Sequence, residues 1–325
     1  MSHKIQPHQH NGRFSFDKQS KSESSLLGSL PSLVSSIIKS SRFRGIDTRS
    51  TWIQRDLPIE RIDSCAITWI GHATFLIQIG GLNILTDPIF GNATPLFRRL
   101  LPSGIAPEAL PPIDVVLLSH NHPDHMDRAS LLFLRDRNPR LSVLVPQGDR
   151  NWFLRHAFSD VTEHAWWQIS RVKSPVLGEL SCTFVPADHW SQRGVFDKNK
   201  SLWGGWVICW NGRRIYFAGD TAYTAHFSSI AKEFTPIDIA LMPIGPIEPR
   251  DHMCHTHIGP EEAIEAFREL GARHFISMHW GTFAFGADAF DAPIHRLVKQ
   301  WDSLKMHLHD KQLHTAKVGN RLHFG

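Results

Sequence analysis

The chain has 325 residues, of which 42% are hydrophobic, so it can form one large domain or two smaller ones around a substantial core. A formal net charge of +4 is too small to indicate nucleic-acid binding, although it is compatible with an anionic membrane surface or substrate. The four cysteines lack zinc-finger or redox spacing, and no segment has the ~20 apolar residues of a membrane span. We therefore expect a cytoplasmic protein, at most peripheral at the inner face of the membrane.

Strands are expected from about Arg61, which separates an N-terminal extension (1–60) from the main domain (61–325). Residues 1–24 are rich in Ser, Lys, His and Gln, and we expect them to be mobile. Apolar residues then recur at helical spacing between Leu26 and Ile38, which predicts a short amphipathic helix. This helix would either pack on the main domain, the interpretation we favour, or lie on a membrane surface.

The main domain alternates between strands and helices. A meander of three strands comes first, with a Gly80-Gly81 turn before the third, and a hairpin is expected around Asn211-Gly212. No solenoid-type repeat is present, and the mixture predicts an α/β (α+β) domain. The expected strands are 66–70, 75–79, 83–86, 115–118, 141–145, 180–185, 203–210, 214–218, 237–242 and 274–277, and the expected helices are 130–137, 147–158, one ending at Glu233, 259–270 and 288–304.

A dense group of metal-binding residue types lies between Asp114 and Asp127, in the sequence DVVLLSHNHPDHMD. The apolar run 115–118 predicts a buried strand, and Pro123 makes the following segment a loop rather than a helix. Three imidazoles and one carboxylate follow within six residues, a ligand set typical of zinc or a similar divalent ion. One such loop can serve two ions, with His120 and His122 at the first and Asp124 and His125 at the second.

Three later segments also end an apolar run with a ligand-type residue, namely His189, Asp220 and His279. They are separated by roughly 30 to 60 residues, so only the fold can bring them together. Asp87 follows an earlier strand, where it could hold a ligand imidazole by its other N–H or cap a turn before Pro88. His72 lies in a turn, where it could line the site or be structural.

These motifs resemble those of a known family. H-x-H-x-D-H after an apolar strand is the signature loop of the metallo-β-lactamase superfamily, whose fold is a four-layer αββα sandwich. From about Ile62 to about Phe285 the chain is similar to N-acylphosphatidylethanolamine-hydrolysing phospholipase D and its bacterial relatives. The segments that carry this closer resemblance are Thr68–Thr74 (TWIGHAT), Leu85–Phe90 (LTDPIF), Ser201–Trp206 (SLWGGW), Phe217–Thr221 (FAGDT) and His279–Phe283 (HWGTF).

The resemblance implies two zinc ions per chain, with iron or manganese as alternatives. It also favours Asp87 as a residue that holds a ligand histidine in place, and we expect His72 to lie beside the ligands in a similar supporting position. Two divalent ions ~3.5–4 Å apart would generate hydroxide from water at neutral pH and neutralise charge on a phosphoryl oxygen. The implied ligands are His120, His122 and His189 for one ion, Asp124, His125 and His279 for the other, and Asp220 as the bridge.

Substrate contacts are expected from three further residues. His257 lies in a stretch that resembles one holding a histidine near the substrate phosphate, so we expect it to contact substrate or to deliver a proton to the leaving group. Arg193 could receive a phosphate, and Trp190 would form a wall of the site. A solvated charge and an ordinary core aromatic are the alternatives for these two.

The resulting hypothesis is a phosphodiester hydrolase that releases an N-acylethanolamine and leaves a phosphatidic acid. Its partner would be a phospholipid or another small phosphodiester, not nucleic acid, while peripheral membrane contact and a homodimer stay open. The alternative is a lactonase or esterase of the same fold acting on a small substrate; a non-catalytic metal-binding protein is the weaker rival. Pro123 and the stretch 244–250 depart from the family pattern near the substrate region, so head group and acyl chain stay open.

Overall fold

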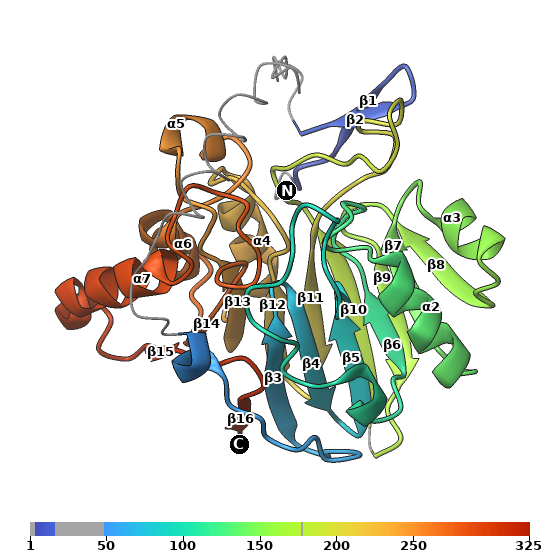
Figure 1. The fold of residues 1–325 in the computed structure, drawn as a ribbon, viewed down its shortest axis with the longest axis horizontal. Helices are drawn as coiled ribbons and strands as arrows, with labels where there is room; N and C mark the ends of the chain where they lie inside the picture. Colours follow the sequence, from blue (N-terminus) through green and yellow to red (C-terminus); the bar gives the residue numbers. More distant parts are fainter. Residues whose placement is uncertain (1–3, 17–48, 177) are drawn as a thin grey trace.

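The computed structural model describes residues 4–16, 49–176 and 178–325, which form two large sheets packed face to face (Figure 1). The first sheet has the order β16-β3-β4-β5-β6-β7-β8 and the second β15-β14-β13-β12-β11-β10-β9. The strands of the first sheet are β3 (Cys65–Gly71), β4 (Thr74–Ile79), β5 (Leu82–Thr86), β6 (Val115–Leu117), β7 (Ser142–Pro146), β8 (Asp160–His164) and β16 (Arg321–Phe324). Those of the second are β9 (Ile169–Lys173), β10 (Glu179–Val185), β11 (Gly205–Trp210), β12 (Arg213–Phe217), β13 (Ile239–Pro243), β14 (His274–Met278) and β15 (Gln312–His314).

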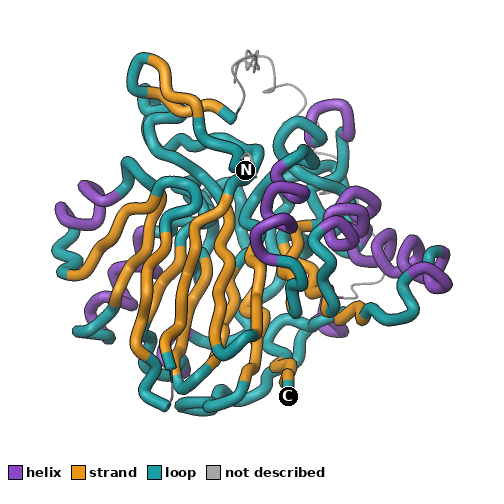
Figure 2. The backbone as a smooth tube through the Cα atoms, turned by 180° about the vertical axis from the view of Figure 1, so that it is seen from behind, coloured by secondary structure: helices purple, strands orange, loops and turns teal. Residues whose placement is uncertain are grey.

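Helices cover the outer faces of both sheets (Figure 2). Along β4, Phe75 and Ile77 belong to the hydrophobic cluster that includes Trp206 of the other sheet, whereas Leu76 packs in a second cluster with Leu131 of α2. This alternation is what a strand buried on both faces requires. The predicted four-layer αββα sandwich is therefore confirmed. The helices are α2 (Arg128–Arg137), α3 (Arg150–Arg155), α4 (His226–Phe234), α5 (Arg250–Met253), α6 (Pro260–Glu269) and α7 (Ala292–Ser303), with 3-10 turns η1 (Arg49–Trp52), η2 (Pro107–Ala109) and η3 (Lys305–His307).

The strand directions bring the predicted ligands to one edge of the sandwich. In the second sheet β10 and β12 run in the same direction, because each is antiparallel to β11, and β12, β13 and β14 are mutually parallel. In the first sheet β3 and β5 likewise share a direction, and β5 is parallel to β6. The residues that follow these strands are His72, Asp87, His120, His189, Asp220 and His279. Segments far apart in the sequence therefore end beside one another.

Most predicted elements are confirmed, with shifts at their ends. The β11–β12 hairpin turns at Asn211 and Gly212, which both have positive φ, as a two-residue hairpin turn requires. The helix expected over 147–158 is shorter and spans only α3, and β11 begins two residues later than expected. Strands β8, β9, β15 and β16 were not predicted. β8 and β9 have exposed, polar positions along them and lack the apolar run that marks a buried strand.

The expectation that residues 1–24 are mobile is wrong for residues 4–16. This segment forms a hairpin of β1 (His8–His10) and β2 (Arg13–Ser15), seen at the top of Figure 1. Phe14 is buried in the main core, and the Trp167 indole Nε1 donates to the Ile5 carbonyl at 2.7 Å. The amphipathic helix expected between Leu26 and Ile38 lies outside the described residues. Within them, we find no helix whose length and apolar character would let it cross a bilayer.

Candidate metal centre

The loop after β6 brings the first three predicted ligands together. His120 Nε2 lies 2.8 Å from His122 Nδ1, and His189 Nε2 lies 3.4 Å from the same atom. His120 and His189 are buried and His122 is half-buried. The three imidazoles thus converge from the β6 loop and from the end of β10, in the set predicted for one ion.

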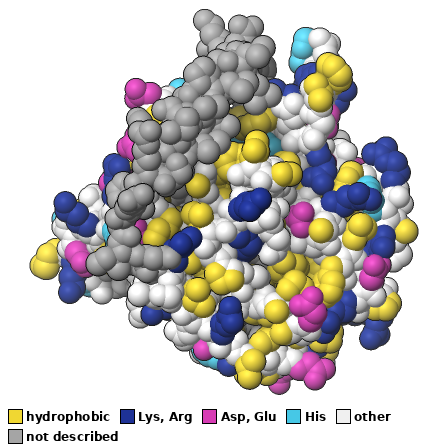
Figure 3. Space-filling view, viewed as in Figure 1, with side chains coloured by type: hydrophobic (Ala, Val, Ile, Leu, Met, Phe, Trp, Pro, Cys, Tyr) yellow, Lys and Arg dark blue, Asp and Glu magenta, His cyan; other side chains and the backbone are white. Residues whose placement is uncertain are grey.

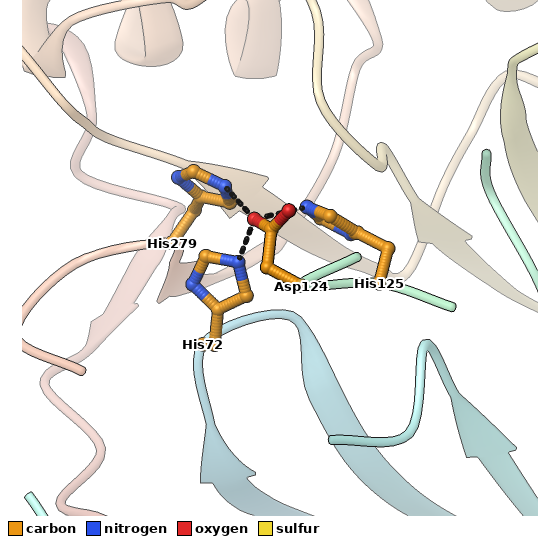
Figure 4. Close-up of side chains that lie close together, drawn as sticks. All are labelled: His72, Asp124, His125 and His279. Carbon is orange, nitrogen blue, oxygen red and sulfur yellow. Dashed lines mark hydrogen bonds and ion pairs between the residues drawn. The ribbon is translucent and has the colours of Figure 1, made fainter. Parts of the chain in front are cut away.

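The second group lies beside the first and comprises Asp124, His125, His279 and His72 (Figure 4). Asp124 Oδ2 is 3.3 Å from His125 Nε2 and 3.9 Å from His279 Nε2. It is also 2.9 Å from His72 Nε2, a direct contact that the sequence did not predict. One possible ligand atom of each of the four side chains lies within 4.8 Å of the others, although the residues come from three different segments.

Asp220 lies between the two groups. Its Oδ2 is 3.0 Å from His279 Nε2 and 3.2 Å from His125 Nε2, and it lies 3.8 Å from His189 Nε2 and 4.0 Å from His120 Nε2. One carboxylate oxygen thus approaches imidazoles of both sets. The side chain is 4% exposed, and its other oxygen, Oδ1, is buried without a hydrogen-bond partner. This position is the one that a bridging ligand would occupy.

Neighbouring groups orient four of the histidines so that Nε2 faces the centre. In each case Nδ1 lies within 3.0 Å of an oxygen that can accept its proton, which leaves Nε2 with a lone pair for a metal. His122 differs, because it presents Nδ1 to its neighbours. The four pairs are His120 with Ser119 Oγ at 2.8 Å, His125 with Asp87 Oδ2 at 2.7 Å, His189 with the Thr256 carbonyl at 3.0 Å and His279 with the Gly245 carbonyl at 2.9 Å.

The donor set fits divalent metal ions. Zn–N bonds of ~2.0–2.1 Å in a tetrahedron place neighbouring ligand atoms about 3.4 Å apart, close to the 2.8–4.0 Å separations between these nitrogens and oxygens. Five buried polar atoms at the site have no hydrogen-bond partner, which is costly unless something else satisfies them. They are His122 Nε2, His125 Nε2, His257 Nδ1, His279 Nε2 and Asp220 Oδ1.

The electrostatics place most of these residues in the protonation states that ligation needs. Burial lowers the pKa of His189 to about 3 and that of His122 to about 4, so both imidazoles are neutral at pH 7. For Asp220, burial alone would raise the pKa, but His125 and His279 lower it well below 3.8, so it is ionised. Burial lowers the pKa of His125 as well, but Asp220 and Asp124 outweigh it and raise that pKa well above 6.5. Metal binding to such a cluster releases protons, since ligating histidines must be neutral.

Asp87 supports both groups from behind. Its Oδ2 accepts from His125 Nδ1 at 2.7 Å and from Ser119 Oγ at 2.5 Å, and its Oδ1 accepts from the Ser119 amide at 2.7 Å. Because Ser119 Oγ in turn contacts His120 Nδ1, one buried carboxylate orients an imidazole of each set. The expectation that Asp87 holds a ligand histidine by its other N–H describes this geometry; the ligand role of that histidine stays a prediction.

His72 is held in place by the loop that carries His279. The His72 amide donates to Thr282 Oγ1 at 2.7 Å, and its carbonyl accepts from the His279 amide at 3.1 Å. His72, Asp87 and His279 have φ of 54°, 34° and 60°, which non-glycine residues rarely adopt. Such backbone strain persists where the surrounding contacts over-determine it, and it clusters at functional sites.

His257 and Trp190 lie at the rim of the cluster. His257 is half-buried, and its Nδ1 lies 3.8 Å from Asp220 Oδ2. Burial lowers the pKa of His257 to about 3, so this imidazole is neutral at pH 7. The Trp190 ring meets the His122 ring edge to face, with centroids 4.2 Å apart. Both side chains therefore adjoin candidate metal ligands, and their contact with substrate stays a prediction.

Arg193 contacts the metal loop, and its predicted contact with a phosphate stays a prediction. Its Nη1 donates to the carbonyl of Met126 at 2.7 Å and to that of Asn121 at 3.4 Å, and the guanidinium lies 5.0 Å from the Trp152 ring centroid. The Arg193 side chain thus binds the backbone of the metal loop. Sequence reasoning could not find this, because a backbone acceptor leaves no mark in the sequence.

The sandwich with a histidine and aspartate cluster at its strand ends defines a metal-dependent hydrolase of the metallo-β-lactamase type. Residues 82–280 match the family of beta-lactamase superfamily domains. The N-acyl-phosphatidylethanolamine-hydrolyzing phospholipase D 1 of Caenorhabditis elegans is 33% identical over 264 residues, which cover 78% of this chain and 74% of that protein. The mitochondrial enzyme of the same name from Saccharomyces cerevisiae is 34% identical over 250 residues, which cover 73% of this chain and 52% of that protein.

The solved structures agree on the fold. Igni18, a metallo hydrolase from Ignicoccus hospitalis, superposes with a TM-score of 0.62 at 22% sequence identity and covers 80% of this chain and 98% of its own. The chain therefore belongs to the beta-lactamase superfamily, in the branch that resembles the N-acyl-phosphatidylethanolamine-hydrolyzing phospholipases D. The predicted membership of this family and the predicted hydrolase class are confirmed. The chain spans about half the length of the yeast relative.

Proposed function

We propose that this protein is a dinuclear zinc hydrolase that cleaves the phosphodiester bond of an N-acylphosphatidylethanolamine, releasing an N-acylethanolamine and a phosphatidic acid. The observation that carries the proposal is the position of Asp220, whose Oδ2 lies within 4.0 Å of imidazoles from both sets. The names of the two relatives above, both N-acyl-phosphatidylethanolamine-hydrolyzing phospholipases D, support the substrate class. The imidazole-rich donor set favours zinc over harder ions that prefer oxygen ligands.

The residues of the chain would divide the work as follows. His120, His122 and His189 would hold one ion, Asp124, His125 and His279 would hold the other, and Asp220 would be shared. Two ions bound in this way would lower the pKa of water towards neutrality and offset negative charge on the phosphoryl group. His257, neutral at pH 7, would donate a hydrogen bond to substrate. It would protonate the departing alkoxide only after taking up a proton itself, for which the attacking water is a source.

A substrate panel tests the proposed reaction. Metal-loaded protein would be assayed against bis-p-nitrophenyl phosphate, N-acylphosphatidylethanolamine in mixed micelles and an acyl lactone. We expect turnover of both phosphodiesters, with the lipid preferred in kcat/KM. Turnover of the lactone alone would replace the phospholipase proposal with the lactonase alternative, because the same centre would then act on carboxyl chemistry.

Peripheral membrane contact is part of the proposal, and the loop between β10 and β11 supports it. Val195 and Phe196 at its tip are 80% and 82% exposed, although apolar, and the Lys198 ammonium lies 5.6 Å from the Trp190 ring centroid in the same loop. Arg13 of the N-terminal hairpin donates to the Phe196 carbonyl at 3.3 Å and holds the tip. Apolar and basic side chains also lie interspersed on the face drawn in Figure 3. Such a pairing suits an anionic lipid surface.

Phe196→Asp is expected to weaken binding to anionic vesicles at least tenfold, because removing a fully exposed aromatic ring from the lipid boundary forfeits ~2 kcal/mol of burial. Cosedimentation with vesicles of phosphatidylglycerol and phosphatidylcholine measures the effect. Leu57→Asp is the matched control, since Leu57 is 82% exposed on a different part of the chain. Equal binding by both variants and the wild type would remove the loop from the account. Hydrolysis of bis-p-nitrophenyl phosphate should be unchanged in both.

A further inference from the structure

A carboxyl group lies buried beneath the metal loop, outside the ligand cluster. Asp149, in the loop between β7 and α3, is 4% exposed. Its Oδ1 accepts from Ser201 Oγ at 2.7 Å and from Asn121 Nδ2 at 3.0 Å. It precedes α3 at the N-cap position but makes no capping hydrogen bond there. The carboxyl is therefore engaged with Asn121, which separates His120 from His122 in the metal loop.

The hydrogen bonding around this pair is incomplete if Asp149 is ionised. Asp149 Oδ2 and Asn121 Oδ1 are both buried, and neither has a hydrogen-bond partner. Two unsatisfied acceptors in one contact would be costly. A proton on Oδ2 supplies the missing donor, because a carboxylic acid and a primary amide have complementary edges: the amide N–H donates to one carboxyl oxygen, and the acid O–H donates to the amide oxygen.

The surrounding charges act in both directions. Burial is the largest influence and raises the pKa of Asp149 to about 7. Ser201 and Asn121 lower it through their hydrogen bonds, and the Arg193 guanidinium lowers it by its charge, although its Nη1 is directed at the carbonyls of Asn121 and Met126. Glu163 raises it and accepts from the amides of Gly148 and Arg150 on either side of Asp149. The neutral acid is thus accessible near physiological pH.

We propose that Asp149 is a positioning residue that acts as a protonated carboxylic acid. Its pairing with the Asn121 amide holds His120 and His122 in the positions from which they would bind their metal. Arg193 fixes the backbone of the same loop from the other side. Ionisation of Asp149 would place a negative charge against the Asn121 oxygen and loosen the loop. This inference concerns the shape of the site and holds whichever bond the enzyme cleaves.

The Asp149→Asn variant separates the two protonation states. An asparagine has the same donor and acceptor edges as the neutral acid, so it should keep zinc affinity near that of the wild type at about pH 6. Above about pH 8 the wild type should bind zinc more weakly than the variant, because Asp149 ionises around its pKa of about 7. Asp149→Ala should lose about 10- to 100-fold in zinc affinity across this range. The ligand histidines should titrate alike in all three proteins. The ratio of their zinc affinities at each pH therefore isolates the effect of Asp149.

Infrared difference spectra of the metal-free wild type against Asp149→Asn give a direct readout. We expect the carbonyl band of a protonated carboxylic acid at about pH 5, and its loss at about pH 9, two units either side of the pKa of about 7. Because the folded state holds this proton more tightly than the unfolded state, stability should fall as pH rises from about 4 to about 7 in the wild type relative to the variant. Asp127→Asn, at the end of the metal loop, is the matched control and should show neither effect.

Two results would overturn the proposal. One is a spectrum without the acid band at low pH, which would mean an ionised carboxyl bridged to Asn121 by water. The other is an Asp149→Asn variant that loses as much zinc affinity as Asp149→Ala at about pH 6. If Asp149→Ala fails to fold, the spectrum and the comparison of Asp149→Asn with the wild type decide the matter alone. None of these readouts requires turnover, so a wrong substrate class would leave them unaffected.

Discussion

Replacing Asp220 with alanine is expected to lower kcat/KM for phosphodiester hydrolysis by at least ~10³-fold, which corresponds to ~4 kcal/mol of lost transition-state stabilisation. The reason is that one oxygen of Asp220 approaches imidazoles of both ligand sets, so its loss would remove the link between the two proposed ions. Assays with bis-p-nitrophenyl phosphate under saturating zinc measure the effect. The circular dichroism spectrum should stay that of the wild type.

Asp302→Ala is the matched control, because Asp302 is an exposed carboxylate on α7, outside the cluster. It should keep full activity and metal content. An Asp220→Ala variant with wild-type turnover would refute the shared-carboxylate arrangement. A variant that lost activity yet still held two metal ions per chain would limit Asp220 to a catalytic rather than a ligating role.

Asp87→Ala is expected to weaken metal binding by about 10- to 100-fold, the usual cost of removing a partner that orients metal ligands. The variant leaves the imidazole N–H of His125 and two donors of Ser119 without their acceptor in a buried position. Each unsatisfied buried donor also costs about 1–3 kcal/mol of folding free energy. Competition with a chromogenic chelator measures zinc affinity, and urea titration measures stability.

Asp114→Ala is the control that separates the loss of zinc affinity from the loss of folding stability. Asp114 precedes β6, at the end opposite the metal loop, where its Oδ2 accepts from the Asn83 amide at 2.8 Å and its carboxylate pairs with Arg61. This variant should lose stability but keep zinc affinity. Equal zinc affinity in Asp87→Ala and the wild type would show that His125 is oriented without Asp87, contrary to the geometry of the site.

The grouping of the metal-ligand candidates could be predicted because the signal is local and repeated. Each candidate follows an apolar run that predicts a strand. Because parallel strands end at the same edge of a sheet, every His or Asp that follows such a strand is predicted to lie near the others. The loop after β6 supplies four of the candidates within six residues. Asp87 was found by the same pattern, since it follows β5 directly.

What the sequence could not predict depends on contacts between distant segments. His72 reaches Asp124 only because the β3–β4 turn is pinned to Thr282, 210 residues away. The N-terminal hairpin packs on the core through Phe14, which is buried, and Phe16, in a polar stretch whose composition predicts mobility. The pairing of Asn121 with Asp149 could not be predicted either, because the two residues lie on different loops.

The measurement that tests the account most directly is a metal titration of the apo protein. Zinc would be added in steps, with bound metal counted and hydrolysis of N-acylphosphatidylethanolamine micelles followed at each step. The account predicts that activity rises until two ions are bound per chain and then stays constant, because hydrolysis requires an ion at each ligand set, with Asp220 shared between them. Full activity at one ion per chain, or two bound ions with no phosphodiester turnover, would contradict it.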